Sequence, residues 1–339
     1  MIWVAVDAMG GDDGPRDVVD GALAATRHFD LGVALVGPAV ALDAELARHG
    51  DIDRSRVRLV EASDVVRMDE SPSAALKRKP GASIARAAAL VARGEAAALF
   101  SAGHTGATVI AAHAAFGMLP GVDRPGLAAT IPTMSPGRQP SVLVDVGASV
   151  DCRPAHLLQF AVMGCMYARV AFGIETPRVG LLSIGEEPTK GNELTREAHK
   201  LLKAAPLTFI GNVEGRDVYG GKADVIVCDG FTGNVALKIS EGLVDAMQGF
   251  LNEELSGTIT ERLGSMLTRR AHRHFRLRMD YSEYGGAPLL GVAGVTIVGH
   301  GRSSAKAVRN AVAMAYRFAA NNFIARVAQD IAAAAVTKQ

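Results

Sequence analysis

The stretch ADVIVCDGFTGNVALK, residues 223–238, sets a pattern that the rest of the chain repeats. Its first half is an apolar run bounded by charged residues, which predicts a buried β-strand. Its second half passes through Thr232, Gly233 and Asn234, small or polar residues that suit a tight turn and the start of a helix. A helix that begins directly after a strand presents free N–H groups and the positive end of its dipole, so it can bind an anion. The same pattern is typical of an ordinary strand–helix turn.

Apolar strands alternate with helical segments along the whole chain of 339 residues. This alternation predicts an α/β fold of three layers, with a largely parallel sheet and helices on both faces. The expected strands are residues 2–7, 31–37, 57–61, 96–100, 127–131, 142–146, 179–184, 207–210, 225–228 and 295–298. We expect residues 1–339 to form a single domain, from which an amphipathic and basic helical segment, residues 243–285, projects.

Six of these strands end in clusters of small and polar residues, which begin at positions 7, 101, 145, 183, 229 and 299. Ligands of open α/β sheets bind beyond the carboxyl ends of the strands, so we expect these clusters to form one extended site. The candidate substrate- or phosphate-binding residues are Asp7, Gly10, Gly11, Ser101, His104, Thr105, Gly106, Asn192, Asp229, Thr232, Gly233, His300, Arg302 and Ser303. His104 could instead cap a helix, and the aspartates that end strands could hold turn N–H groups or a metal. The carboxylates form no tight cluster, so we expect no metal.

Composition excludes several classes of protein. Hydrophobic residues make up 49% of the chain and charged residues 21%, as in globular proteins. The net charge of +1 gives no reason to expect a nucleic-acid partner. Three scattered cysteines do not suggest a disulfide framework. The first residues do not resemble a signal peptide, and no apolar run approaches the ~18 residues of a membrane span, so we expect a cytoplasmic protein.

Standard catalytic motifs are absent from the sequence. It contains no P-loop, no G-x-G-x-x-G after its first strands, no G-x-S-x-G, no H-E-x-x-H and no C-x-x-C. We therefore expect no cofactor and no covalent serine or cysteine intermediate. Catalysis would depend on positioning and electrostatics around an anion. Lys190 is the most suggestive cation, although a lysine in such a loop is often only solvated.

Six motifs, in order, resemble those of the phosphate acyltransferase (PlsX) family. They are AVDAMGGD (5–12), SAGHTGA (101–107), VDVGASVDCRP (144–154), IGEEPTKGNELT (184–195), CDGFTGNVALK (228–238) and HGRSSAKA (300–307). The resemblance implies a fold like that of phosphotransacetylases and isocitrate dehydrogenase. It also implies transfer of a fatty acyl group from acyl carrier protein to inorganic phosphate, which gives acyl phosphate for phospholipid (phosphatidic acid) synthesis.

The resemblance further implies catalytic roles for Lys190 and Asn234, and a homodimer bound peripherally to the inner face of the cell membrane. Lys190 would offset negative charge, while Asn234 and the N–H groups of residues 232–234 would donate to the thioester carbonyl oxygen. The family usually has Asn where this chain has His104. A phosphotransacetylase that uses coenzyme A thioesters is the nearest alternative. A non-catalytic acyl or phosphate sensor and a nucleotide-dependent dehydrogenase are more distant ones.

Residues 243–266 carry apolar side chains at intervals of three or four, which predicts an amphipathic helix. The basic stretch RRAHRHFRLR, residues 269–278, follows directly. Arg269, Arg270 and Arg273 are therefore candidate contacts to an anionic membrane or to an acidic carrier protein. The pattern also fits a core-facing helix followed by a solvated basic loop.

Overall fold

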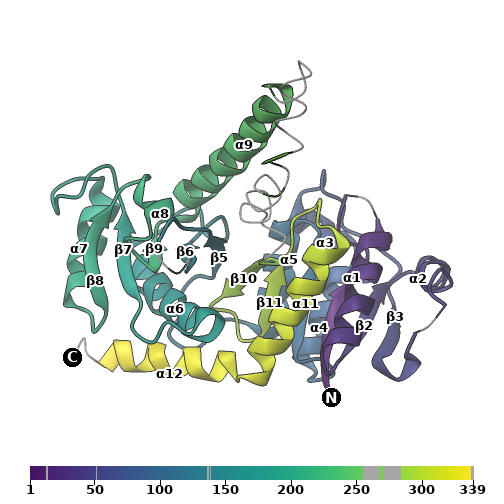
Figure 1. Ribbon diagram of the computed structural model, residues 1–339. Helices are drawn as coiled ribbons and strands as arrows, with labels where there is room; N and C mark the ends of the chain where they lie inside the picture. Colours follow the sequence, from purple (N-terminus) through teal and green to yellow (C-terminus); the bar gives the residue numbers. More distant parts are fainter. Residues whose placement is uncertain are drawn as a thin grey trace.

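A single sheet of 11 strands runs through the molecule, and helices cover both of its faces (Figure 1). The strand order is β3-β2-β1-β4-β11-β10-β5-β6-β9-β7-β8. This computed structural model describes residues 1–12, 14–50, 52–135, 137, 139–254, 267–268, 270 and 284–336, with the side chains of 252 and 334–336 excepted. The predicted α/β fold with a largely parallel sheet is confirmed. The division into domains stays a prediction.

The strands are β1 (Ile2–Asp7), β2 (Leu31–Gly37), β3 (Val57–Glu61), β4 (Ala98–Ser101), β5 (Gly126–Ile131), β6 (Ser141–Val144), β7 (Arg178–Leu182), β8 (Thr208–Val213), β9 (Val225–Val227), β10 (Ala287–Leu290) and β11 (Val295–Val298). The helices are α1 (Pro15–His28), α2 (Ala39–Leu46), α3 (Pro72–Arg78), α4 (Ser83–Ala92), α5 (Thr105–Phe116), α6 (Pro154–Phe172), α7 (Glu193–Ala204), α8 (Asp217–Gly220), α9 (Gly230–Glu254), α11 (Ala305–Ala320) and α12 (Phe323–Val336), with a 3₁₀ turn, η1, at Arg54–Arg56. Every residue of β2 is buried, as expected for an interior strand of a parallel sheet covered on both faces.

The sheet consists of two parallel groups joined by antiparallel strands. The first lobe contains β1–β4 and β11, and the second contains β6–β9. Between them, β10 pairs antiparallel with β11 and with β5, and β5 pairs antiparallel with β6. In a flat sheet the two groups would end at opposite edges. Residues from the ends of both groups nevertheless line one pocket, described below, so the sheet must twist strongly at its centre.

Some predicted elements differ from the structure. The prediction omitted β10, a run of four residues that contains Pro288. The helix expected after the turn at 232–234 begins earlier, at Gly230. After β11 the chain forms two helices, α11 and α12, which separate at Asn322, where a φ of 52° breaks the helical path.

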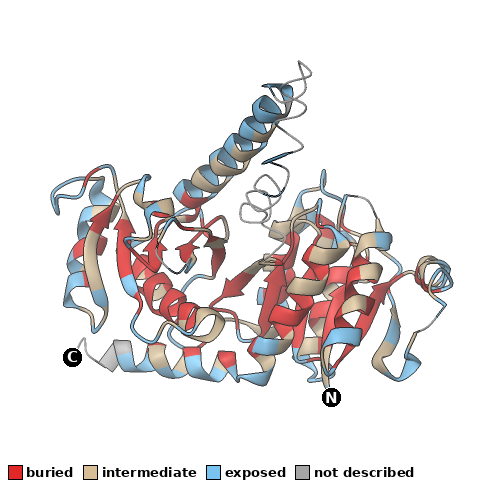
Figure 2. Ribbon diagram, in the orientation of Figure 1, coloured by how far each residue is buried: buried red, intermediate tan, exposed pale blue. Residues whose placement is uncertain are grey.

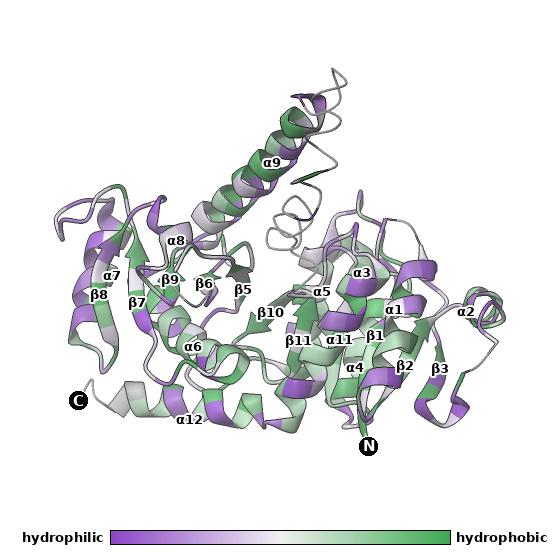
Figure 3. Cartoon of the chain, in the orientation of Figure 1, coloured by the Kyte–Doolittle hydropathy of each residue, from purple (hydrophilic) through white to green (hydrophobic). Residues whose placement is uncertain are grey.

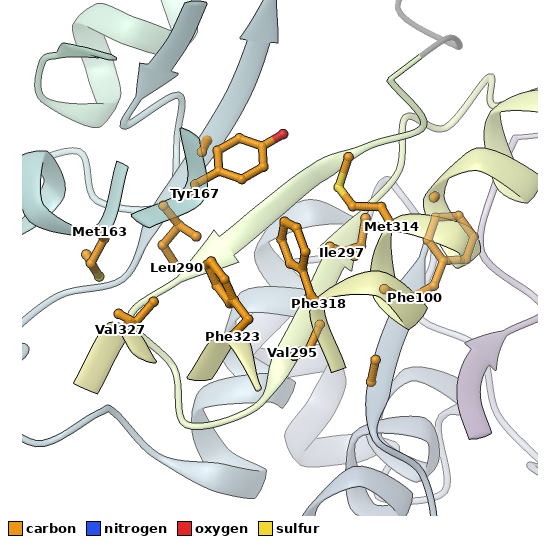
Figure 4. Close-up of a cluster of buried hydrophobic side chains, with 14 of the residues drawn as sticks. Phe100, Met163, Tyr167, Leu290, Val295, Ile297, Met314, Phe318, Phe323 and Val327 are labelled. Carbon is orange, nitrogen blue, oxygen red and sulfur yellow. The ribbon is translucent and has the colours of Figure 1, made fainter. Parts of the chain in front are cut away.

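Buried aromatic side chains join the two lobes on the side away from α9 (Figures 1 and 4). Phe318 of α11 packs edge-on against Tyr167 of α6, with ring centroids 5.7 Å apart, and stacks on Phe323 of α12 at 4.4 Å. Arg169 of α6 also forms an ion pair with Asp330 of α12 at 2.8 Å. These aromatic contacts and this ion pair therefore fix the two lobes relative to each other.

Helix α6 corrects the expectation that no segment is apolar enough to span a membrane. By length and composition alone, its 19 residues meet that requirement. In the structure, 67% of the helix's most apolar stretch is buried inside the protein, and Phe160, Met163 and Tyr167 are fully buried. The helix packs on β6 and β9 and against α7 and α12. Its hydrophobicity is that of a core helix.

Helix α9 projects away from both lobes (Figure 1). Most of its side chains are exposed, although many are hydrophobic (Figures 2 and 3). The exposed apolar residues include Val235, Ile239, Leu243, Met247 and Phe250, which recur at helical spacing. Arg270 is exposed and helical, whereas Arg269 and Arg273 lie outside the described residues.

Candidate active site

A pocket of about 460 Å³ lies at the base of α9, between the lobes. We call it the α9 pocket. It is lined by residues that follow β1, β4, β6 and β11, by one face of α9, and by strands β5 and β10. These residues are Asp12, Met68, Gly103, Thr105, Gly106, Leu127, Ala129, Thr130, Val146, Gly147, Asn234, Leu237, Lys238, Glu241, Tyr284, Gly285, Gly286, Ala287, Val298, Gly299, His300 and Gly301. The expectation that several strand ends meet at one site is correct for these four strands.

Asn234 enters the α9 pocket because two loops interlock at the start of α9. Gly233 packs against the main-chain carbonyl of Asp145 so closely that a Cβ atom would collide with it. A Cβ atom at Gly230 would lie 2.6 Å from Asp145 Oδ2. Gly147, with a φ of 132°, lies beside Asn234, and a Cβ atom there would be 3.5 Å from Asn234 Cγ. The glycines therefore permit the close approach that places the amide in the pocket.

Asp145 organises the loop that forms this wall. Its side chain is fully buried and accepts hydrogen bonds from the N–H groups of Leu127, Gly147 and Ala148, each at 2.9 Å, and of Ser149 at 2.6 Å. Burial raises the pKa of Asp145, and these four donors act in the opposite direction. Of the two roles considered for the strand-end aspartates, Asp145 therefore has the structural one.

The N–H groups at the start of α9 are largely occupied. Gly230 donates to the carbonyl of Ser149 at 2.9 Å, and Thr232 and Gly233 donate to Asp229 at 2.9 and 3.0 Å. Asp229 thus caps the helix. In this structure the N–H groups of Thr232 and Gly233 therefore already have acceptors, and the substrate contact expected of them stays a prediction. Asn234 alone of this motif's candidates lines the pocket.

Lys238 is a cation that the sequence reasoning missed. It lies one helical turn after Asn234, on the same side of α9, and also lines the pocket. Its ammonium group forms an ion pair with Glu241 at 2.8 Å. His300, from the loop after β11, supplies a second basic side chain. The spacing of four residues between Asn234 and Lys238, which places them on the same side of a helix, could have indicated Lys238 from the sequence.

Lys190 lies in the exposed loop after β7, a neighbour of β9 in the sheet. Its Cβ and Cγ atoms pack over Gly185. Among the described residues it does not line the α9 pocket. Asn192 caps α7 by accepting the Thr195 N–H group at 2.9 Å. The structure thus does not bring Lys190 or Asn192 to Asn234, and their roles stay predictions.

The remaining candidates of the first lobe gather in a second cavity, of about 500 Å³, beyond the ends of β1 and β4. We call it the β1–β4 pocket, and it contains Asp7, Gly10, Gly11, Ser101 and His104. His104 caps α5, since its Nδ1 atom accepts the Gly106 N–H group at 3.1 Å. The helix-capping possibility considered for this histidine is therefore correct.

The loop after β11 contributes His300 to the α9 pocket, but Arg302 and Ser303 line neither cavity among the described residues. Arg302 is exposed, and its N–H group donates to His300 Nδ1 at 3.2 Å. Ser303 is buried. The helix cap is the next residue, Ser304, whose hydroxyl accepts the Ala307 N–H group at 3.3 Å.

The cysteines are poor nucleophiles. Burial raises the pKa of Cys152 to about 11 and that of Cys165 to about 12, and it raises the pKa of Cys228 well above its usual value. Their thiols stay protonated at neutral pH. The geometry instead offers an amide and basic groups around a cavity, an arrangement suited to anion binding and oxyanion stabilisation.

Comparison with known proteins identifies the family. Residues 2–326 match the family described as "Fatty acid synthesis protein". The chain belongs to this family. Over 97% of its length it is 49% identical to the phosphate acyltransferase of Heliobacterium modesticaldum, of which it covers 97%. It is 51% identical to the phosphate acyltransferase of Nitratidesulfovibrio vulgaris, with 97% of this chain and 95% of the relative covered.

Other proteins of solved structure have the same fold as this chain. A phosphotransacetylase from Streptococcus pyogenes superposes with a TM-score of 0.65 at 18% identity, covering 94% of each chain. A phosphotransacetylase from Staphylococcus aureus gives a TM-score of 0.58 at 17% identity, again over 94% of each chain. The predicted similarity to the phosphotransacetylase fold is confirmed.

Proposed function

We propose that the protein transfers an acyl group from a thioester to inorganic phosphate and supplies acyl phosphate for phospholipid synthesis. The observation that carries this proposal is the near-full-length match to relatives named phosphate acyltransferase. The α9 pocket supports it, because Asn234, Lys238 and His300 surround a cavity that also has apolar walls. The protein is thus an acyltransferase.

The reaction requires no enzyme nucleophile. A phosphate oxygen attacks the thioester carbonyl carbon, the C–S bond breaks, and the sulfur leaves as a thiolate that takes up a proton. Lys238 and His300 hold the phosphate, and the Asn234 amide donates to the carbonyl oxygen as negative charge develops there. Lys190 is a second cation proposed from the family resemblance. The apolar residues Leu127, Ala129, Val146, Leu237 and Val298 offer a surface for the acyl chain.

The proposed acyl donor is acyl carrier protein. The alternative, a coenzyme A thioester, has only the fold of the phosphotransacetylases in its favour. Thiol release from a long-chain acyl carrier protein, with and without phosphate, tests the proposal. We expect release that depends on phosphate and exceeds that from the matching coenzyme A thioester. Equal or faster turnover of the coenzyme A thioester would favour the alternative, and phosphate-independent release would reject both.

We also propose a cytoplasmic homodimer that associates with the inner face of the membrane. Exposed apolar residues along α9, such as Ile239, Leu243 and Phe250, need a covering surface in water. The basic stretch 269–278 suits anionic lipid or an acidic carrier. Sedimentation with anionic liposomes, and the mass in solution, test the two associations.

Charge reversal shows whether the basic stretch binds the membrane or the acyl carrier protein. The variant combines changes to Glu at Arg269, Arg270 and Arg273, and Arg48→Glu in the turn after α2 is the control. Loss of liposome sedimentation would identify the membrane. Lower activity in solution with unchanged sedimentation would identify the carrier.

A further inference from the structure

The β1–β4 pocket adjoins the α9 pocket but differs from it in chemistry. The two cavities share Asp12, Met68 and Gly103 as lining residues, so they meet at the loops after β1 and β4. The volume of the β1–β4 pocket, about 500 Å³, is that of a small-molecule site. The reaction proposed above uses none of the side chains found only in the β1–β4 pocket.

Asp7 gives the β1–β4 pocket an unused acceptor. Its side chain is only 4% exposed, and Oδ2 accepts the Ser101 hydroxyl at 2.7 Å. Oδ1 is buried and accepts no hydrogen bond of ordinary length and angle among the described residues, although the Ser83 hydroxyl and the Met9 N–H group lie near the carboxyl. A buried acceptor of this kind favours a ligand that brings an N–H or O–H group. The Asp7 carboxyl disfavours free phosphate in this cavity, and Arg67, a cation of the lining, is already paired with Asp69 at 3.2 Å.

His104 gives the same pocket a donor. Its Nδ1 atom accepts the Gly106 N–H group, so the neutral ring carries its proton on Nε2. The remaining lining includes the apolar residues Val65, Val66 and Ile84 and the polar residues Arg67, Ser83 and Thr108. An acceptor, a donor and apolar walls together suit an uncharged chain in which methylene groups alternate with amides. They do not suit a plain hydrocarbon, which would leave Asp7 Oδ1 without a donor.

A thioester carries two arms that diverge from the carbonyl group. With that carbonyl at Asn234, the apolar side of the α9 pocket receives the acyl chain, and the adjoining cavity is left for the other arm. We propose that the β1–β4 pocket binds the pantetheine arm of the acyl donor, which has two amides and a hydroxyl. This inference rests on the proposed function. Acyl carrier protein and coenzyme A both carry the arm.

The test narrows the β1–β4 pocket and compares donors with full and truncated arms. Val65→Phe adds a ring to the lining, and Val40→Phe on α2, where Val40 is 85% exposed, is the matched control. The donors are palmitoyl pantetheine and palmitoyl N-acetylcysteamine, which keeps only the amide nearest the sulfur. We expect Val65→Phe to raise KM at least fivefold for the first and less than twofold for the second.

Equal changes with both donors, or no change with either, would overturn the inference. A KM increase that follows acyl chain length would place the hydrocarbon in this pocket and overturn it too. His104→Ser keeps a capping oxygen but removes the ring donor, so it supplies the test if Val65→Phe does not fold. Palmitoyl acyl carrier protein and palmitoyl coenzyme A then distinguish the two sources of the pantetheine arm. Both donors should bind more weakly to the variant, and the kcat/KM of the wild type for each shows which donor the enzyme prefers.

Failure of the proposed function gives a different result. Wild-type protein would then release no thiol from any donor in a phosphate-dependent manner. Calorimetric titration with pantetheine alone still decides the inference in that case. Binding to the wild type that weakens at least fivefold in Val65→Phe but not in Val40→Phe supports it, and any other pattern overturns it.

Discussion

Gly233 packs directly against the main-chain carbonyl of Asp145, and this contact sets where α9 begins. The loop after β6 and the first turn of α9 are thereby locked together, with Asn234 as the next residue along the helix. The position of the proposed catalytic amide therefore depends on a glycine that does not itself line the α9 pocket.

Replacing Gly233 with Ala should displace the start of α9. The added methyl group would collide with the Asp145 carbonyl, and overpacking of this kind costs about 1–3 kcal/mol. We expect a lower free energy of unfolding in urea and at least a tenfold lower kcat. Gly242→Ala is the control, because a Cβ atom there has no neighbour within 4 Å and Ala favours the helix by up to about 1 kcal/mol. Equal behaviour of the two variants would contradict the packing argument.

Asp145→Asn should destabilise the wall of the pocket. The amide nitrogen cannot accept a hydrogen bond, so at least one of the four N–H donors around Asp145 loses its partner, at a cost of about 1–3 kcal/mol. Urea unfolding should show this loss. Asp229→Asn is the matched control, since Asn caps a helix about as well as Asp. If Asp145→Asn were as stable as the wild type, the carboxylate would not be what holds this loop in place.

The two lysines should affect different kinetic constants. Lys238 lines the pocket, so Lys238→Ala should raise the KM for phosphate about tenfold, equivalent to about 1.4 kcal/mol of binding, with little change in kcat. Lys190, proposed for the transition state, should instead lower kcat about a hundredfold when changed to Ala. Lys200→Ala on α7 is the control, because that lysine has a similar exposed ion pair, with Glu197 at 2.7 Å. A phosphate KM unchanged in Lys238→Ala would exclude it from phosphate binding.

His156 should make stability fall in mild acid. Burial lowers its pKa in the folded protein below 6.5, with the charge of Arg153 as a further cause. The unfolded chain then binds more protons below about pH 6.5, so the contribution to stability is present above that pH and is lost as the pH falls. Between pH 7 and pH 5, wild type should lose more unfolding free energy than His156→Gln. Parallel curves would show that this histidine does not titrate differently on folding.

The sequence predicts the strands well because buried parallel strands are continuous apolar runs, as in β2. It does not predict β10, whose four residues include a proline and pair antiparallel on both sides. The sequence does not predict where α9 begins, for a different reason. Gly230 and Gly233 are poor helix formers, and the start of the helix coincides with their packing against Asp145 and with the Asp229 cap.

The site is predictable in part for similar reasons. Thr105, Gly106 and His300 follow strands whose ends do meet at the α9 pocket, and Asn234 reaches it from the first turns of α9. Asn192 caps a helix elsewhere, and a capping asparagine has the same local sequence pattern as one that binds a ligand. Lys238 lies within a helix, and only the three-dimensional structure shows which side of α9 faces the pocket.

The most direct test of the central claim is phosphate-dependent thiol release from long-chain acyl carrier protein by Asn234→Ala. Removal of a single oxyanion donor costs about 3 kcal/mol of transition-state stabilisation. We therefore predict a kcat about a hundredfold below wild type, with an unchanged midpoint of urea unfolding. Turnover within threefold of wild type in a folded Asn234→Ala variant would contradict the assignment of the α9 pocket as the active site.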